Sequence, residues 1–245
     1  MNRKLYGVAL AVAVAGATPG IAEISQMSAH VGSMAAGMEA EAAPAEEGGA
    51  LNNLRFEPWQ MVDEMFFRDD VVYLMRHGPT DWSKLDEKNV NPTDCDNQRV
   101  MIEDGINDMR RMGFVLGENG VMPGKIVVSE WCRNQQTVEA LLEGYEAAEP
   151  GTAEGIPVET SADLNLLLSL QGAENVTALR DRISEWEGSD GQGPLLLVSH
   201  FTNIEELTQF TVYEGEILVI DPKRDNRVLG YVRLSSAEPD VGHFP

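Results

Sequence analysis

The sequence predicts an α/β protein: a three-layer α/β/α sandwich around a mixed, mostly parallel sheet. Continuous apolar runs are typical of strands covered on both faces, and they occur at residues 71–75 (VVYLM), 125–130 (KIVVSE) and 194–200 (PLLLVSH). Segments with helical periodicity alternate with these runs, at about residues 98–116, 134–147 and 174–186. This alternation with short loops favours a layered α/β domain over a β-sandwich.

The C-terminal part of the chain predicts two more strands. Residues 216–234 (EILVIDPKRDNRVLGYVRL) consist of two apolar runs joined by a polar turn. If this hairpin joins the edge of the parallel sheet, the sheet is mixed.

The N-terminal segment has the three-part layout of a secretory signal peptide. Arg3 and Lys4 precede an apolar run from Leu5 to about Ala17, and small residues lead to a cleavage position after Ala22. The run is shorter than the roughly 20 residues that a membrane-spanning helix needs. We therefore predict an exported protein, periplasmic or secreted, with a signal peptide at residues 1–22 and no stable membrane insertion after cleavage.

Residues 23–53 are rich in Ala, Glu, Met and Gly and contain almost no aromatic or β-branched residues. Such a segment cannot bury enough apolar surface to offset the entropy of ordering, so we predict an acidic flexible linker. Residues 54–245 are long enough for one domain with a sizeable core.

The chain is strongly acidic, with 40 Asp and Glu against 18 Lys and Arg and a formal net charge of -22. A surface of this charge repels nucleic acid and anionic membranes, so neither is an expected partner. It also repels phosphorylated molecules at long range, so any anion site requires a local basic pocket.

The chain has two cysteines, Cys95 and Cys132. In an oxidising compartment an even number is readily explained by one structural disulfide, which would stabilise the fold by roughly 3 to 4 kcal/mol on the chain-entropy estimate. Two free or metal-binding thiols are the alternative. No CxxC or histidine-rich spacing indicates a metal site.

Polar and charged residues follow the three apolar strands where each one ends. Arg76 and His77 follow the first strand, Ser129 and then Arg133 follow the second, and Ser199 with His200 ends the third. Ligands of open α/β sheets bind at the carboxyl ends of the strands. Two arginines and two histidines should therefore converge at one edge of the sheet.

These motifs resemble those of the histidine phosphatase superfamily, which includes the phosphoglycerate mutases, over most of residues 70–233. The resemblance rests on LMRHG after the first strand, on VVSEWCRNQQTVEAL for the second arginine and on LLLVSHFTNI for the second histidine. The stretch DCDNQRVMIEDGINDMRRMG is similar to an exported subgroup that includes phosphatases acting on lipopolysaccharide core heptose phosphate. The resemblance implies a phosphoglycerate mutase-like fold.

The resemblance also implies roles for the residues at the strand ends. His77 would be the nucleophile that becomes phosphorylated, and Arg76, Arg133 and His200 would bind the transferring phosphoryl group, without metal or cofactor. A neutral imidazole is a competent nucleophile near pH 7, and arginine matches the charge on phosphoryl oxygens. Gly78 would permit close backbone approach to phosphate and a positive φ. Ser129 would donate to phosphate or cap the following helix.

The familiar proton donor of the superfamily is missing. A glutamate often stands between the second arginine and the second histidine, but the chain has Asn165 there, and Phe201 rather than aspartate follows the second histidine. An amide cannot deliver a proton. Asp81 is the preferred substitute, ahead of Asp163 and Glu174. A surface or loop-capping role is the alternative for all three, and for Asp81 the two interpretations are about equally favoured.

Two functions are therefore predicted. The first is an exported phosphatase that hydrolyses a small phosphomonoester, such as a sugar phosphate, through a phosphohistidine intermediate; substrate or inorganic phosphate is its expected partner. The alternative is a weak or inactive phosphate-binding protein that lacks the general acid. Arg99 is interpreted as a salt-bridged helix residue rather than a substrate cation, and neither His30 nor His243 is given a role.

Overall fold

The computed structural model of the chain describes residues 54–58, 62–167, 169–188 and 193–239. The predicted signal peptide and linker, with His30, lie outside these residues, as does His243.

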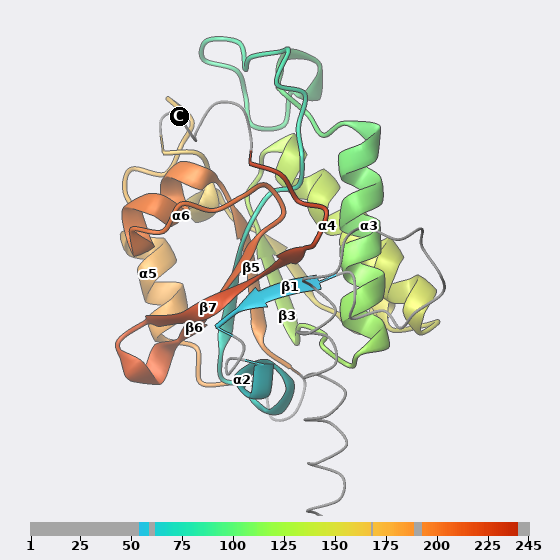
Figure 1. The fold of residues 1–245 in the computed structure, drawn as a ribbon. Helices are drawn as coiled ribbons and strands as arrows, with labels where there is room; N and C mark the ends of the chain where they lie inside the picture. The colour runs from blue at the N-terminus through green and yellow to red at the C-terminus, as the bar shows by residue number, and fades with distance from the viewer. Residues whose placement is uncertain (1–53, 59–61, 168, 189–192, 240–245) are drawn as a thin grey trace, which may run out of the picture. The chain divides into compact units, whose positions relative to one another are not determined.

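Strands and helices alternate through most of the described chain (Figure 1). The strands are β1 (Leu54–Glu57), β2 (Val72–Arg76), β3 (Lys125–Val128), β4 (Val158–Thr160), β5 (Leu195–Ser199), β6 (Ile217–Asp221) and β7 (Arg227–Leu234). The α-helices are α2 (Val62–Phe67), α3 (Glu103–Glu118), α4 (Cys132–Ala148), α5 (Thr177–Ser184) and α6 (Phe201–Thr208). Short 3₁₀ turns occupy Cys95–Asn97, Ala153–Gly155, Ala162–Leu164 and Pro222–Arg224.

The seven strands form one mixed sheet in the order β1-β7-β6-β2-β5-β3-β4. Strands β2, β5, β3 and β4 are parallel to one another, and β6 joins them antiparallel to β2. The predicted hairpin of β6 and β7 therefore does extend the sheet. The antiparallel part is larger than predicted because β1, whose short LRFE stretch has no clear strand pattern, pairs with β7.

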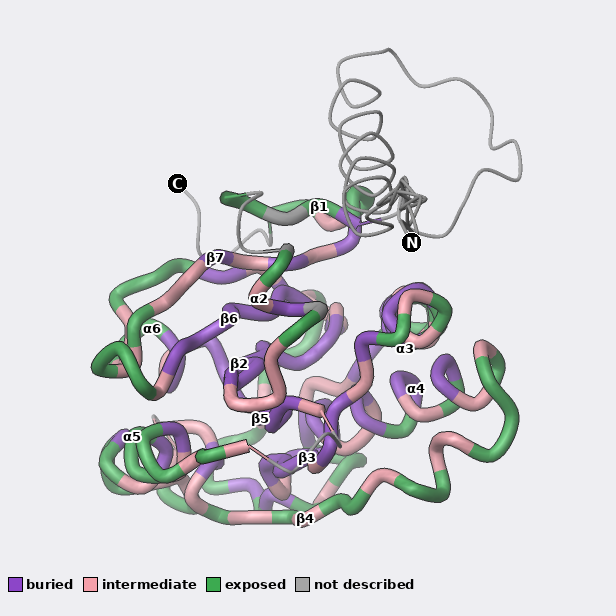
Figure 2. Tube along the Cα trace, turned by 90° about the horizontal axis from the view of Figure 1, so that it is seen from below, coloured by how far each residue is buried: buried purple, intermediate pink, exposed green. Residues whose placement is uncertain are grey.

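Helices cover both faces of the sheet, which confirms the predicted three-layer α/β/α architecture. Helices α3 and α4 lie on one face and α5 and α6 on the other (Figures 1 and 2). Successive residues of β2 enter opposite cores: Tyr73 and Met75 pack on the α3/α4 side, and Val72 and Leu74 on the α5/α6 side. Strands buried on both faces read as continuous apolar runs, which is why their positions could be predicted.

Helices α3 and α4 lie side by side (Figure 2). They pack closely because glycines lie at their contact. A Cβ atom on Gly113 would stand 2.1 Å from the carbonyl oxygen of Leu141, and one on Gly144 would stand 2.1 Å from that of Arg110. Backbone atoms at such distances leave no room for a side chain. This packing fixes the position of α4, whose first turn carries Arg133.

The helix predicted from about residue 98 begins at Glu103. The residues before it are occupied by other pairings: Met101 forms an isolated antiparallel bridge with Thr80, and its N–H donates to the side chain of Gln136. Within the described ranges, no helix is long and apolar enough to cross a membrane.

Candidate active site

The ends of three neighbouring parallel strands bring the predicted residues together. Arg76 pairs with Ser199 in the register of β2 and β5, and the N–H of His77 donates to the carbonyl oxygen of Ser199 at 3.1 Å. The His77 and His200 rings are consequently neighbours, with centroids 5.6 Å apart. Ser129 follows β3 on the other side of β5, and its N–H donates to the carbonyl oxygen of Val198.

A cavity of about 240 Å³ lies at this edge of the sheet. Its lining combines residues of the strand ends with residues of the loop between β2 and α3: Arg76, His77, Trp82, Leu85, Asp86, Arg99, Arg133, Leu166, His200, Phe201 and Thr202. The predicted nucleophile His77 belongs to this lining, as do Arg76, Arg133 and His200 of the predicted phosphate-binding residues. In a chain of formal charge -22, this is the local basic pocket that an anion site requires.

Arg76 is fully buried and held from several sides. Its Nη1 donates to the carbonyl oxygen of Val212 at 2.9 Å, its Nη2 lies 3.5 Å from Oε1 of Glu214, and its guanidinium stands over the ring of Phe201. A guanidinium fixed in this way loses little entropy when it binds a ligand.

His77 is oriented by the carbonyl group of Gly78. Its Nδ1 lies 3.0 Å from the carbonyl oxygen of Gly78, an acceptor only, so Nδ1 carries the proton and Nε2 keeps its lone pair. Burial, together with the charges of Arg133 and Arg76, places the pKa of His77 well below its ordinary value of 6.5. The ring is therefore neutral at pH 7, as a nucleophile must be.

The tautomer of His200 is fixed through Ser129 and Asn165. Oδ1 of Asn165 accepts the backbone N–H of Glu130 at 3.0 Å, which identifies that atom as the amide oxygen. The Ser129 hydroxyl, 2.9 Å from this oxygen, must donate to it, and therefore accepts from Nε2 of His200 at 3.0 Å. Nδ1 of His200 is left without a proton.

Nδ1 of His200 is also buried and has no hydrogen-bond partner among the described residues. Burial, with the charges of Arg133 and Arg76, lowers the pKa of His200 well below 6.5. The cavity therefore contains a proton acceptor as well as cations. A phosphate group that still carries one proton suits this arrangement better than a fully ionised one.

Arg133 turns one edge of its guanidinium toward Asp86 and leaves another edge available. Its Nη1 and Nη2 donate to the two carboxylate oxygens of Asp86 at 3.0 and 3.2 Å, and Nη1 also donates to the carbonyl oxygen of Arg99. Its Nε is buried and has no partner among the described residues. Nε–H and the second Nη2–H lie on one edge, the geometry that binds two oxygens of a phosphoryl group.

The loop that carries Asp86 is tied to the helix that carries Arg133. Cys95 and Cys132 form the predicted disulfide, with Cα atoms 5.6 Å apart. The side chain of Gln98 donates to the carbonyl oxygens of Asn91 and Pro92 and accepts the N–H of Cys132. These contacts hold the loop over the cavity.

Gly78 has neither the positive φ that the prediction assigned to it nor a free backbone N–H. Its φ is not positive, and its N–H donates to Oγ1 of Thr137 at 2.8 Å instead of remaining available to a ligand. A Cβ here would lie 2.5 Å from Cγ of Met109 and 2.7 Å from Cε of Met101. The glycine is required by the packing of α3 against the strand end.

Ser129 and Asp81 also differ from expectation. The Ser129 hydroxyl is committed to Asn165 and His200 and does not line the cavity, and helix α4 starts without a side-chain cap. Asp81 does not line the cavity either. Its carboxylate accepts from the hydroxyl and N–H of Ser83, which hold the pKa of Asp81 below its usual range.

The structure does not bring the two other candidate acids to the cavity. Asp163 accepts from Ser161 and Arg182, and its side chain is 44% exposed. Glu174 is exposed on the surface. The carboxyl group that does line the cavity is that of Asp86, which no sequence pattern marks.

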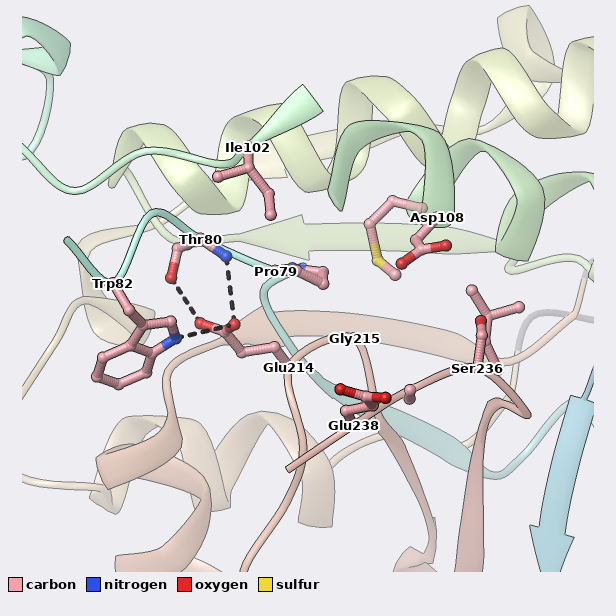
Figure 3. Close-up of a pocket in the computed structure, with 12 residues that line it drawn as sticks. Pro79, Thr80, Trp82, Ile102, Asp108, Glu214, Gly215, Ser236 and Glu238 are labelled. Carbon is pink, nitrogen blue, oxygen red and sulfur yellow. Dashed lines mark hydrogen bonds between the residues drawn. The ribbon is translucent and has the colours of Figure 1, made fainter. Parts of the chain in front are cut away.

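Glu214 is a second carboxylate that sequence reasoning missed. It accepts from the N–H and hydroxyl of Thr80 at 3.2 and 2.6 Å and from the indole N–H of Trp82 at 3.2 Å (Figure 3). Its Oε1 lies 4.0 Å from Nδ1 of His77. Glu214 thus ties the start of the loop to Arg76 and His77 of the strand end.

Among the described residues, no group of three or more His, Cys, Asp or Glu is arranged to ligate a metal ion. The charged and titratable groups of the cavity lining are three arginines, two imidazoles and the carboxylate of Asp86.

No protein-family model and no curated protein matches the sequence. The chain is similar, at low identity, to solved structures of histidine phosphatases and a phosphoglycerate mutase. The protein histidine phosphatase SixA complexed with tungstate is 20% identical, with 61% of this chain and 86% of that chain covered and a TM-score of 0.44. The mycobacterial glucosyl-3-phosphoglycerate phosphatase Rv2419c is 16% identical, with 71% of this chain and 100% of that chain covered and a TM-score of 0.41. Phosphoglycerate mutase from Thermus thermophilus is 18% identical, with 67% of this chain and 99% of that chain covered and a TM-score of 0.41.

Proposed function

We propose that the chain is a phosphatase that hydrolyses a small phosphomonoester, such as a sugar phosphate, through a phosphohistidine intermediate on His77. The observation that carries the proposal is the pair of buried, unpartnered nitrogens, Nε of Arg133 and Nδ1 of His200, in the cavity that a neutral His77 also lines. Buried polar atoms in native structures almost always have partners. A phosphoryl group supplies oxygens for the first and a proton for the second.

The first chemical step uses only groups of this cavity and of the substrate. The lone pair on Nε2 of His77 forms a bond to phosphorus while the bond from phosphorus to the leaving oxygen breaks. Arg76 and Arg133 stabilise the charge on the equatorial oxygens. The leaving oxygen takes the proton that the substrate monoanion shares with Nδ1 of His200. This shared proton replaces the one that a carboxylic acid in place of Asn165 would supply.

The second step returns the site to its starting state. A water molecule attacks phosphorus, the bond to Nε2 of His77 breaks, and a proton of that water passes to Nδ1 of His200 and then to the departing phosphate. His200 is neutral before and after the cycle, as its lowered pKa requires.

A non-catalytic phosphate-binding protein is the second candidate function. It is favoured by the contacts of Asp86, the carboxyl group of the cavity lining. In its contacts with two nitrogens of Arg133 and the N–H of Arg99, the Asp86 side chain is an acceptor. A cavity without a carboxylic acid that donates a proton can bind phosphate and turn over slowly or not at all.

The experiment that separates the two functions is phosphate release from para-nitrophenyl phosphate between about pH 4 and pH 8, a range that brackets imidazole titration. An aryl leaving group needs little protonation, so even an enzyme with a weak acid cleaves it. Turnover by the parent protein that disappears in His77→Ala supports the phosphatase. Inorganic phosphate binding without turnover supports the binding protein.

We further propose that residues 1–22 are a signal peptide, that residues 23–53 are a linker, and that residues 54–245 act in the periplasm or outside the cell. The disulfide is consistent with an oxidising compartment. N-terminal sequencing of the exported protein tests the proposal. A chain that starts after Ala22 supports it, and an intact Met1 contradicts it.

A further inference from the structure

Among the described residues, Arg99 differs from the other arginines that are at least partly buried. The arginines that are at least partly buried form ion pairs with carboxylates: Arg68 with Asp221, Arg76 with Glu214, Arg110 with Glu143, Arg133 with Asp86, Arg182 with Asp163 and Arg233 with Glu216. Arg99 is partly buried as well, yet among the described residues its guanidinium pairs with no carboxylate and donates no hydrogen bond. In a chain with 40 acidic residues, this is an unusual state for a desolvated cation.

The position of Arg99 is fixed although the N–H groups of its guanidinium form no hydrogen bond within the described residues. Its N–H donates to Oδ1 of Asp86 at 2.8 Å, and its carbonyl oxygen accepts from Arg133 at 3.2 Å. Its guanidinium lies over the ring of Trp82, with Cζ 3.8 Å from the ring centroid. The indole is held in turn by Glu214 (Figure 3). The side chain is therefore a positioned cation, and it lines the same cavity as His77.

The charges of the cavity leave Arg99 as the cation in excess. Glu214 offsets Arg76, and Asp86 offsets Arg133. Arg76 at the end of β2 and Arg133 in the first turn of α4 are also almost fully buried. Arg99 instead lies in the loop with Trp82 and Leu85, and Leu85 is 83% exposed. Arg99 is thus on the open side of the cavity, where the part of a substrate beyond its phosphoryl group must extend.

We infer that Arg99 binds a second anionic group of the substrate, a carboxylate or a second phosphoryl group carried by the leaving group. The inference rests on the proposed phosphate site, because it assigns the phosphoryl group to Arg76, Arg133 and His200. A planar guanidinium stacked on an indole offers two parallel N–H donors, the geometry that both kinds of anion accept. The pocket would then select phosphomonoesters with two anionic groups over neutral phosphorylated alcohols.

Binding of non-hydrolysable phosphonates tests this selection whether or not the protein turns over. We would measure, by titration calorimetry on the full mature chain, the affinities of para-carboxybenzylphosphonate and para-carbamoylbenzylphosphonate, which have nearly the same shape and differ by one charge. A second pair, propane bisphosphonate and propylphosphonate, tests the second phosphoryl group. Inorganic phosphate, measured alongside, reports on the phosphoryl site alone.

We expect the parent to prefer the doubly anionic member of at least one pair by about tenfold, the size of one charge-assisted hydrogen bond. In Arg99→Gln the preference should fall to about one. In Arg99→Glu the charge preference should reverse, so that para-aminomethylbenzylphosphonate binds more tightly than para-carboxybenzylphosphonate. Arg180→Gln, which changes an exposed arginine of α5 outside the cavity, should keep the preference of the parent.

The pair that shows the preference identifies the second anion. No preference in either pair, or a preference that Arg99→Gln keeps, would overturn the inference. A fall in inorganic phosphate affinity equal to the fall for the carboxylate ligand would also overturn it, since Arg99 would then bind the transferring phosphoryl group. A parent that binds no phosphate at all would instead contradict the proposed function beneath it.

Discussion

The floor and the wall of the cavity are built by different means. The floor consists of residues at or just after the strand ends, namely Arg76, His77, Arg133 and His200, which are no more than 2% exposed. Backbone hydrogen bonds between β2 and β5 set the positions of Arg76, His77 and His200. The wall is the loop between β2 and α3, which side-chain contacts and one disulfide hold in place. Backbone pairing fixes the groups that we propose to react, whereas side-chain contacts shape the part that we propose to meet the substrate. Function is commonly divided between scaffold and loops in this way.

The largest effect should come from removing a cation of the floor. Arg133→Gln deletes the Nε–H and Nη2–H edge that stabilises the phosphoryl group, and we expect kcat/KM for para-nitrophenyl phosphate to fall about 100- to 1,000-fold. Arg110→Gln, at an arginine of α3 whose side chain is 42% exposed and paired with Glu143, is the matched control and should stay near the parent value. A loss below about threefold for Arg133→Gln would show that the floor does not bind the transferring group.

Removing the disulfide that holds the wall should lower the stability of the fold more than the rate of phosphate release. Cys95 and Cys132 are 37 residues apart, so Cys95→Ser with Cys132→Ser should lower the free energy of unfolding by roughly 3 to 4 kcal/mol on the chain-entropy estimate. Urea unfolding of the parent and the double variant measures the change. If the parent loses no stability on reduction, the disulfide does not hold the wall.

The pH dependence of kcat/KM should differ from that expected of histidines that titrate at their usual pKa of 6.5. The pKa of His77 lies well below 6.5, so the neutral nucleophile persists as the pH falls through 6.5 and turnover should not decline there. At higher pH the substrate loses its second proton, with a pKa near 6, and His200 loses the shared proton. We therefore expect kcat/KM to fall up to about tenfold per pH unit above that value. Initial rates in buffers of constant ionic strength provide the test.

Ser129→Ala sharpens the same prediction. It removes the hydroxyl that fixes the His200 tautomer, so Nδ1 of His200 is no longer held as a proton acceptor. The preference for protonated phosphate, and with it the dependence of inorganic phosphate affinity on pH, should become weaker. Ser161→Ala is the control, because Ser161 also loses a hydroxyl bonded to its neighbours but lies outside the cavity lining. An unchanged pH dependence in Ser129→Ala would remove His200 from the proton path.

The smallest effect is expected at the junction of wall and floor. In Glu214→Gln an amide replaces a carboxylate that accepts three hydrogen bonds, and its NH₂ group faces donors at Thr80 and Trp82. We expect about 1 to 3 kcal/mol less stability and a loss of up to about tenfold in kcat/KM through Arg76. Thermal unfolding and steady-state kinetics measure the two effects. Equal stability of parent and variant would mean that Glu214 does not join the two regions.

The same division explains how much the sequence can predict. The floor is predictable because apolar runs locate strands and the residues after them fall at one edge of a parallel sheet. Arg76, His77, Arg133 and His200 accordingly line one cavity. The pairing of the two cysteines is predictable as well, since a chain with a predicted signal peptide favours a disulfide and two cysteines allow only one intramolecular pair.

The wall could not be predicted in the same way. Asp86 and Glu214 are two of 40 acidic residues, and no periodicity marks which of them turn inward. Closeness to His77 in sequence favours Asp81, but the loop places Asp86 in the cavity lining. The sequence predicts a helix and an ion pair for Arg99, yet this residue precedes α3 and stacks on Trp82. Irregular loops depend on side-chain contacts distant in sequence, which local patterns do not contain.

The measurement that tests the central proposal most directly is trapping of the phosphorylated protein. The mature chain would be mixed with para-nitrophenyl phosphate, quenched in alkali, where phosphohistidine survives, and analysed by peptide mass spectrometry. We expect one phosphoryl group on the peptide that contains His77, lost in acid and absent from His77→Ala. A phosphoryl group on another residue, or turnover by the parent with no trapped intermediate and undiminished turnover by His77→Ala, would contradict the proposal.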